Sequence, residues 1–211
     1  SLLVTNIEAD HLDYYGTVAA LEDAFAQVGD AVGGPRVACI DDAGVRRLAQ
    51  RVPVTTYGRS SDADWVLSDL DHGPAGIEFR LHHAGDDWQF SVPTPGTHTA
   101  RNAAGVAALL AELGLPVEGV ADALRDFGGV HRRYEIRAVS AGVTIVDDYA
   151  HHPTEIAATV EAATAATPGR VIAVFQPHRY SRTADLGPEF GEPRLWLKRN
   201  AEGLHRYRFR D

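Results

Sequence analysis

The fold is decided by the first part of the chain, where apolar runs alternate with helical patterns. LLVTNI at residues 2–7, VACI at residues 37–40 and VPVTTY at residues 52–57 are apolar and rich in β-branched residues, which predicts strands, the first two of them buried. Between these runs, apolar residues spaced three and four apart over residues 17–32 predict an amphipathic helix, and residues 45–51 predict a short one. This alternation is the pattern of a parallel α/β sheet.

The pattern changes in the middle of the chain. Short alternating stretches over residues 63–92, separated by Gly and Asp, predict antiparallel hairpins. PTPG at residues 93–96 then breaks the chain before two expected helices, Asn102–Leu113 and Val117–Phe127.

A Gly128-Gly129 break suggests that a second domain starts near residue 132. After it the pattern predicts a second β-α-β unit, with a buried strand at Val143–Val146, a helix at Thr154–Ala166 and a strand at Val171–Phe175.

Composition excludes several classes of protein. The 211 residues are 45% hydrophobic and 23% charged, as in an ordinary globular protein. A net charge of −9 argues against a nucleic-acid partner, and no apolar run reaches the ~18–20 residues that cross a membrane.

The single cysteine, Cys39, permits no disulfide framework, which fits a cytoplasmic protein. Because the chain has no methionine and opens inside an apparent strand, we expect it to be a piece of a longer protein.

Two polar clusters lie beside the first predicted sheet. TNIEADHLD at residues 5–13 follows a strand and places His11 among carboxylates, a set that can hold a divalent cation or can simply cap a helix. PGTHTARN at residues 95–102 is a turn into a helix, which can hold a base or phosphate through Asn102 and backbone N–H groups. Ordinary capping by Thr97 or Thr99 is the alternative, and on the residues alone it is favoured.

Two more clusters end strands of the second unit. DDYAHHPTE at residues 147–155 suggests zinc through its His-His pair, but adjacent residues do not share a helix face and no third ligand follows at zinc spacing. QPHRYSR at residues 176–182 carries Arg179 and Arg182, which can bind carboxylate or phosphate through paired N–H groups. Together the two clusters predict a site for an anionic ligand, the alternative being arginines paired with nearby carboxylates.

Two motifs are absent from the sequence. There is no G-x-x-x-x-G-K-[ST] phosphate loop, and Lys198 is the only lysine. There is also no G-x-S-x-G, and Cys39 lies inside an apolar run, so no candidate for nucleophilic acyl chemistry is present.

With these clusters in this order, the chain resembles the Mur ligase family, ATP-dependent amide-forming enzymes of peptidoglycan synthesis. The resemblance covers residues 4 to about 186. TNIEADHLD, GVHRRYE at residues 129–135, DDYAHHPTEI and FQPHRYSRT are similar to the branch that joins L-alanine to UDP-N-acetylmuramate.

The resemblance implies an α/β fold with a partial P-loop-type central domain containing a small antiparallel sheet, followed by a partial Rossmann-like domain. Residues 1–131 would be the later part of the central ATP-binding domain, and residues 132–191 the first half of the C-terminal domain. Residues 192–211, with six basic and three acidic side chains, form an Arg-rich tail unlike the family.

The resemblance also implies roles for individual residues, with ATP and Mg²⁺ as cofactors. His11 matches a magnesium-holding histidine. His98, Asn102, Arg133 and Asp148 match nucleotide-contacting positions, although Thr99 stands where the family often has asparagine. Positions facing the muramyl substrate and the incoming alanine match Tyr149, His151, His178, Arg179 and Arg182. Among these residues His11, Arg179 and Arg182 are the expected catalytic ones.

Two alternatives remain open at this point. One is the recycling ligase that attaches a ready-made tripeptide to UDP-muramic acid, which shares two of the motifs but differs in the PHRYSR stretch. The other is a non-catalytic fragment that binds nucleotide or nothing, since no phosphate loop is present. We expect the 211 residues alone to be inactive.

Overall fold

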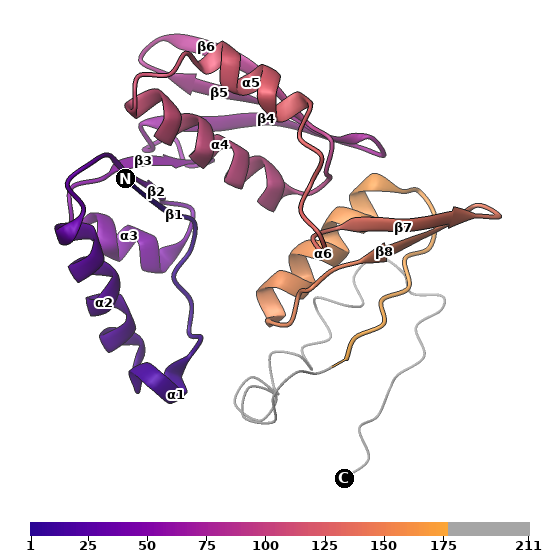
Figure 1. Cartoon of the computed structure of the whole chain (residues 1–211), viewed down its shortest axis with the longest axis horizontal. Coiled ribbons are helices and arrows are strands. Elements are labelled where there is room, and N and C mark those ends of the chain that lie inside the picture. Colours follow the sequence, from indigo (N-terminus) through magenta and orange to yellow (C-terminus); the bar gives the residue numbers. More distant parts are fainter. Residues whose placement is uncertain (177–211) are drawn as a thin grey trace. The chain divides into compact units, whose positions relative to one another are not determined.

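The computed structural model describes residues 1–176, which fall into two compact units (Figure 1). The first unit is Ser1–Gly128 and the second begins at Gly129, and each is described by itself. Both combine helices with strands, which confirms the α/β class. The assignment of residues 1–131 and 132–191 to two family domains stays a prediction.

The first unit is built on one six-stranded sheet in the order β1-β2-β3-β4-β5-β6. The first four strands pair in parallel, and β5 and β6 continue the same sheet in antiparallel pairing. The predicted hairpins therefore extend the parallel sheet. The strands are β1 (Leu2–Val4), β2 (Arg36–Cys39), β3 (Thr55–Gly58), β4 (Trp65–Gly73), β5 (Gly76–His83) and β6 (Asp86–Val92).

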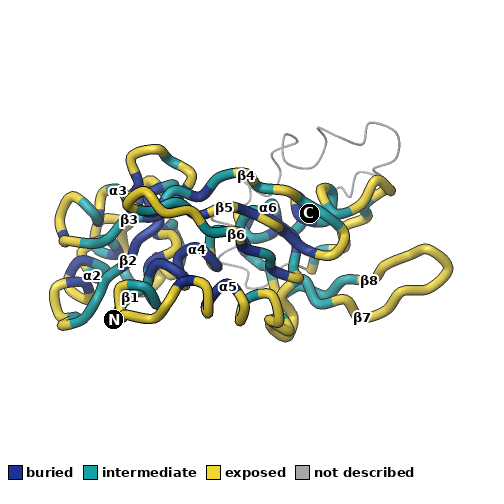
Figure 2. Tube along the Cα trace, turned by 90° about the horizontal axis from the view of Figure 1, so that it is seen from above, coloured by how far each residue is buried: buried dark blue, intermediate teal, exposed yellow. Residues whose placement is uncertain are grey.

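Helices cover both faces of this sheet, because successive strand residues point to opposite sides. Ala38 belongs to the core under α2 and α3, whereas Val37 and Cys39 belong to the core under α4 and α5. Figure 2 shows the buried residues gathered along the strands and α4. The helices are α1 (Leu12–Tyr15), α2 (Val18–Ala31), α3 (Ala43–Ala49), α4 (Thr97–Glu112) and α5 (Val117–Arg125).

The helix expected from Asn102 begins earlier, at Thr97. Gly96 adopts a φ of 112°, a value that only glycine reaches without strain, and its carbonyl accepts the N–H groups of Thr99 and Ala100 at 3.0 and 3.3 Å. The turn that was expected to lead into the helix is therefore its first turn, so His98 and Asn102 lie on one helix.

The second unit differs more from expectation. Residues 135–140 form an additional strand, β7 (Glu135–Ser140), which pairs antiparallel with β8 (Val143–Asp147) and precedes α6 (Pro153–Ala166). The predicted buried strand is in fact largely exposed, at 61% for Val143 and 54% for Ile145.

The prediction of a strand at Val171–Phe175 is wrong, since residues 171–176 carry no strand. A strand needs a neighbour to pair with, and the hairpin has no third strand in the described part of this unit. Within residues 1–176 no helix combines the length and apolar character required to cross a membrane.

Candidate functional site

His11 lies where the chain leaves the sheet after β1, at the N-cap of the short helix α1. Its backbone is left-handed (φ 57°), and its N–H donates to Asp10 Oδ1 at 2.8 Å. Its Nε2 lies 3.5 Å from Asp10 Oδ2, and its side chain is 58% exposed. The imidazole is therefore open to a ligand on one side and braced by a carboxylate on the other.

The loop before His11 is anchored to the sheet by Asp42. One oxygen of this carboxylate, Oδ1, accepts the N–H of Val45 at 2.8 Å, capping α3, and the N–H of Ile7 at 3.2 Å. A helix cap and the loop after β1 thus share one acceptor.

The chemistry at His11 fits one ligand of a magnesium ion rather than a closed cage. Among residues 1–176 no three His, Cys, Asp or Glu side chains converge as a metal-binding group. Mg²⁺ at nucleotide sites keeps several waters and is held by one or two carboxylates together with phosphate oxygens. The exposed imidazole of His11 would add a single nitrogen ligand, directly or through a water, to such an open site.

His98 neighbours both Arg101 and Asn102 on the surface of α4, because residues three and four apart in a helix are neighbours, whereas Arg101 and Asn102 are adjacent and point in different directions. Asn102 is exposed, and His98 is partly buried. Nε of Arg101 donates to Asp41 Oδ2 at 3.0 Å, and Asp41 follows the carboxyl end of β2. Ligands of open α/β sheets bind at this end of the strands. Asp41 was not among the residues expected from sequence, because an acidic turn after a strand carries no specific signal.

In the second unit Asp148 connects two loops. Its Oδ2 accepts the N–H of Tyr134 at 2.8 Å and its Oδ1 accepts the N–H of Ala150 at 2.7 Å. Both oxygens therefore bind backbone in this structure. Each still has a second lone pair, so a contact to a nucleotide hydroxyl is chemically open.

Near Asp148, the carboxylate of Glu155 contacts three hydrogen-bond donors. Its Oε2 accepts the N–H groups of His151 and His152 at 3.0 and 3.2 Å, and its Oε1 lies 3.2 Å from Arg133 Nη1. Burial raises the pKa of this carboxyl, but the two backbone N–H groups and the positive charges of His151 and Arg133 outweigh burial and leave the pKa lowered. Glu155 is therefore held ionised, and Arg133 is held beside it.

Tyr149 is held by the segment before β7. The guanidinium of Arg132 stacks on the Tyr149 ring at 4.7 Å, and the Tyr149 N–H donates to the Arg132 carbonyl at 2.8 Å. Arg132 and Tyr134 both have positive φ, 56° and 48°, which is costly for side chains of this size. Such strain persists only where surrounding contacts enforce it.

The His-His pair is engaged within the protein. His151 Nδ1 lies 2.9 Å from the Tyr149 carbonyl oxygen, and His152 Nδ1 accepts the N–H of Thr154 at the start of α6. Because no metal-binding group of three side chains converges among residues 1–176, the zinc interpretation gains no support there. His178, Arg179 and Arg182 lie outside the described residues, so their predicted roles stay predictions.

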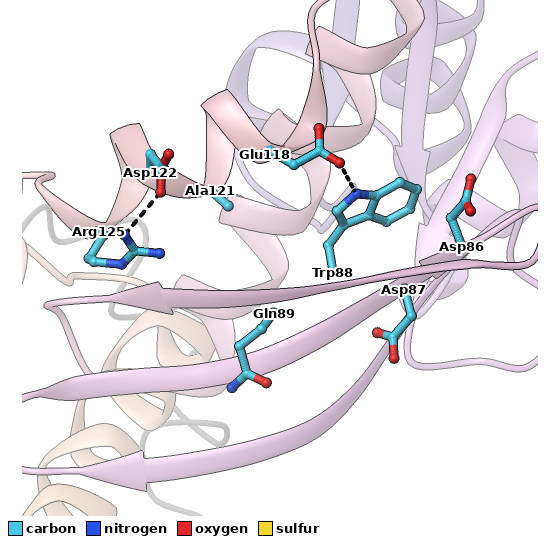
Figure 3. A pocket seen from close by; sticks show the side chains of 8 residues that line it. All are labelled: Asp86, Asp87, Trp88, Gln89, Glu118, Ala121, Asp122 and Arg125. Carbon is cyan, nitrogen blue, oxygen red and sulfur yellow. Dashed lines mark hydrogen bonds and ion pairs between the residues drawn. The ribbon is translucent and has the colours of Figure 1, made fainter.

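A surface groove of about 600 Å³ lies between β6 and α5 (Figure 3). Across this groove Trp88 donates Nε1–H to Glu118 at 2.9 Å, and Arg125 pairs with Asp122 at 2.9 Å. None of the site residues expected from sequence lines this groove. The lining residues are Asp86, Asp87, Trp88, Gln89, Glu118, Ala121, Asp122 and Arg125.

Family models match both parts of the chain. The Mur ligase middle domain matches residues 2–110, and the Mur ligase glutamate ligase domain matches residues 132–196. The chain belongs to the Mur ligase family. This confirms the family resemblance drawn from the four motif clusters.

Curated relatives and solved structures agree with the family. The UDP-N-acetylmuramate--L-alanine ligase of Kineococcus radiotolerans is 45% identical over 197 residues, 90% of this chain, and that of Clavibacter sepedonicus is 43% identical over 192 residues, 89% of this chain. The chain spans 42% and 40% of these two relatives' lengths.

Among solved structures, the UDP-N-acetylmuramate-alanine ligase of Thermotoga maritima is 27% identical, with a TM-score of 0.73, over 88% of this chain and 43% of that one. The MurF ligase of the same organism, in complex with ADP, is 19% identical, with a TM-score of 0.70, over 90% of this chain and 46% of that one. This second likeness is one of fold alone.

Proposed function

We propose that these residues form part of an ATP-dependent, cytoplasmic ligase that joins L-alanine to UDP-N-acetylmuramate in peptidoglycan synthesis. The observation that carries this proposal is the identity of 43–45% to enzymes of that name over about nine-tenths of the chain. The PHRYSR stretch at residues 177–182 favours alanine addition over tripeptide addition.

The proposed reaction has two steps. A carboxylate oxygen of the muramyl lactyl group attacks the γ-phosphorus of ATP, and the bond to the β-phosphate oxygen breaks to release ADP. The amine of alanine then attacks the acyl carbon, phosphate leaves, and the amine loses a proton. Phosphoryl transfer of this kind requires positioning and charge neutralisation more than covalent work by the protein.

The chain's own residues would supply that positioning. His98 and Asn102 would contact the nucleotide from α4, and Arg133 and Asp148 would contact it from the second unit. His11 would hold Mg²⁺, which supplies charge neutralisation at the phosphates when it is bound. The residues proposed to face the muramyl substrate and alanine are Tyr149, His151, His178, Arg179 and Arg182.

Arg133 supports this assignment because it is already held next to a carboxylate, 3.2 Å from Glu155. A guanidinium has five N–H donors, so Arg133 can stay paired with Glu155 and still offer further N–H groups to a phosphate.

A chimera tests the proposed function. The segment of the Kineococcus radiotolerans ligase that aligns with this chain is replaced by the corresponding residues of this chain, and ADP release is measured with UDP-N-acetylmuramate and L-alanine. Activity that requires both substrates supports the proposal. A folded chimera that accepts a tripeptide and not alanine, or that accepts neither, contradicts it.

A substitution in the same chimera tests the magnesium assignment. His11→Ala is expected to lower turnover by about two orders of magnitude, which is the usual effect of removing one group that stabilises charge in the transition state. His82→Ala, on the exposed face of β5, is the matched control and should leave turnover near that of the parent. Near-normal turnover of His11→Ala across a range of Mg²⁺ concentrations contradicts the assignment.

A further inference from the structure

Asp41 sits in the turn after β2 and binds the turn after β3. Its side chain is only 11% exposed. The N–H of Arg59 lies 2.9 and 3.0 Å from the two carboxylate oxygens, and the N–H of Ser60 lies 3.2 Å from Oδ1. One carboxylate thus joins the carboxyl ends of two neighbouring strands.

The backbone at Gly58 makes room for this carboxylate. Gly58 has a φ of 154°, and a Cβ placed there would lie 2.6 Å from Asp41 Oδ1. A side chain at residue 58 would therefore displace Asp41. The absence of a side chain at Gly58 is therefore what allows the Asp41 carboxylate to lie against the turn after β3.

The third element held by Asp41 is α4. Arg101 Nε donates to Asp41 Oδ2 at 3.0 Å, and the Arg101 side chain is 39% exposed. Gly96 caps α4 without a side-chain hydrogen bond, and the first turn contains no acidic residue. The ion pair to Asp41 therefore ties the start of α4 to the sheet where a conventional cap is missing.

Arg101 lies three residues after His98, its neighbour on the helix surface, and directly precedes Asn102 in the same turn of α4. We infer that Asp41 and Arg101 form a positioning pair that holds His98 and Asn102 in register with the carboxyl end of the sheet, so that these side chains meet the nucleotide. This inference rests on the proposed function, which assigns His98 and Asn102 to the nucleotide.

The pair is suited to this role because of where it lies. Ion pairs between fully exposed side chains contribute little, whereas a charge-assisted hydrogen bond to a carboxylate that is largely buried is stronger and more directional. Loss of either partner removes the direct ion pair of the other one at the edge of the sheet.

Binding of ADP to the 211-residue chain tests the inference, with chemical-shift titration at millimolar ADP and Mg²⁺ as the readout. The variants are Asp41→Asn, Arg101→Gln and the double variant. The amide oxygen introduced by Asp41→Asn is still an acceptor for the Arg59 and Ser60 N–H groups, so the turn after β3 is retained. Arg46→Gln is the matched control, because Arg46 lies on α3 and pairs with Asp62 and Ser60 in that same turn.

Each single variant is expected to weaken ADP binding roughly tenfold, which corresponds to about 1.4 kcal/mol. The double variant should be no weaker than Arg101→Gln, since Asp41 acts through Arg101. Arg46→Gln should bind as the parent does. Melting temperatures of all variants are measured alongside, because a merely structural pair would lower stability and leave the affinity of the folded protein unchanged.

The outcomes separate the inference from the proposed function. Parent and variants that bind ADP equally well overturn the positioning role and leave the proposed function standing. Additive losses in the double variant also overturn it. If the chemical shifts of residues 97–102 in the parent chain do not change at any ADP concentration tested, the nucleotide assignment of α4 is wrong, and the positioning role is wrong with it.

Discussion

Arg133 and Glu155 form an ion pair, 3.2 Å from Nη1 to Oε1, that joins the segment before β7 to the first turn of α6. The other oxygen of Glu155 accepts the N–H groups of His151 and His152. A single carboxylate therefore caps α6 and holds an arginine proposed to contact the nucleotide. Both roles depend on the same side chain, and the contact to Arg133 depends on its charge.

Glu155→Gln is expected to destabilise the second unit by about 0.3–1 kcal/mol, because it removes a negative charge from the N-terminus of α6 while the capping box itself can be kept by glutamine. Glutamine keeps one acceptor oxygen but loses the charge that holds Arg133. Glu161→Gln on the exposed side of α6 is the matched control. The difference is measured by urea denaturation, with a spectroscopic probe placed in this unit. Equal midpoints for the two variants would show that the charge of Glu155 contributes nothing.

The pH dependence of this unit follows from the lowered pKa of Glu155. A carboxyl with a lower pKa in the folded state stabilises fully above its unfolded value, near 4.5, and loses that contribution as pH falls through the folded pKa. Stability should therefore drop on acidification below about pH 4.5, and Glu155→Gln should flatten this dependence. An unchanged slope in the variant would assign the acid sensitivity to other groups.

Asp42→Ala should lower stability by about 1–2 kcal/mol, at the upper end for an N-cap, because Asp42 holds Ile7 as well as Val45. Thr17→Ala is the control, since Thr17 caps α2 through Ala20 alone. Hydrogen exchange at Ile7 should rise only in the Asp42 variant. If both variants leave that amide equally protected, Asp42 does not anchor the loop that leads to His11.

Gly105→Ala is expected to destabilise the first unit by about 1–3 kcal/mol through overpacking. The added Cβ would lie 2.6 Å from the fully buried Tyr57 ring and 2.9 Å from Leu3, where α4 crosses the sheet. Gly119→Ala on α5 meets nothing nearer than 3.8 Å and should be neutral or slightly stabilising. Thermal unfolding compares the two, and equal melting temperatures would refute the close packing.

The 211 residues alone are expected to release no phosphate from ATP. No G-x-x-x-x-G-K-[ST] motif is present, and the only lysine is Lys198. Phosphate release is measured with and without Mg²⁺ on a highly purified sample. Magnesium-dependent release that His11→Ala abolishes would overturn this expectation.

Local patterns in the chain were sufficient to predict the parallel strands, α2, the antiparallel hairpins and the polar clusters that follow strands. Those features depend on hydrophobic periodicity and on turn residues, which neighbours in sequence determine. The residues around His11, Asn102 and Asp148 were recognised for the same reason, since a motif is a local pattern.

The remaining features depend on partners far apart in the chain. Residues 171–175 are apolar and rich in β-branched residues like a strand, yet they carry no strand because pairing requires a neighbour that periodicity cannot supply. Asp41 appeared only as a turn residue, and its contact to Arg101, 60 positions away, exists because β2 and α4 pack together. Asp148 accepts the N–H of Tyr134, 14 positions earlier, which the fold brings to it. Hydrogen bonds between distant segments come from packing, and only the tertiary structure reveals which acidic residues brace the site.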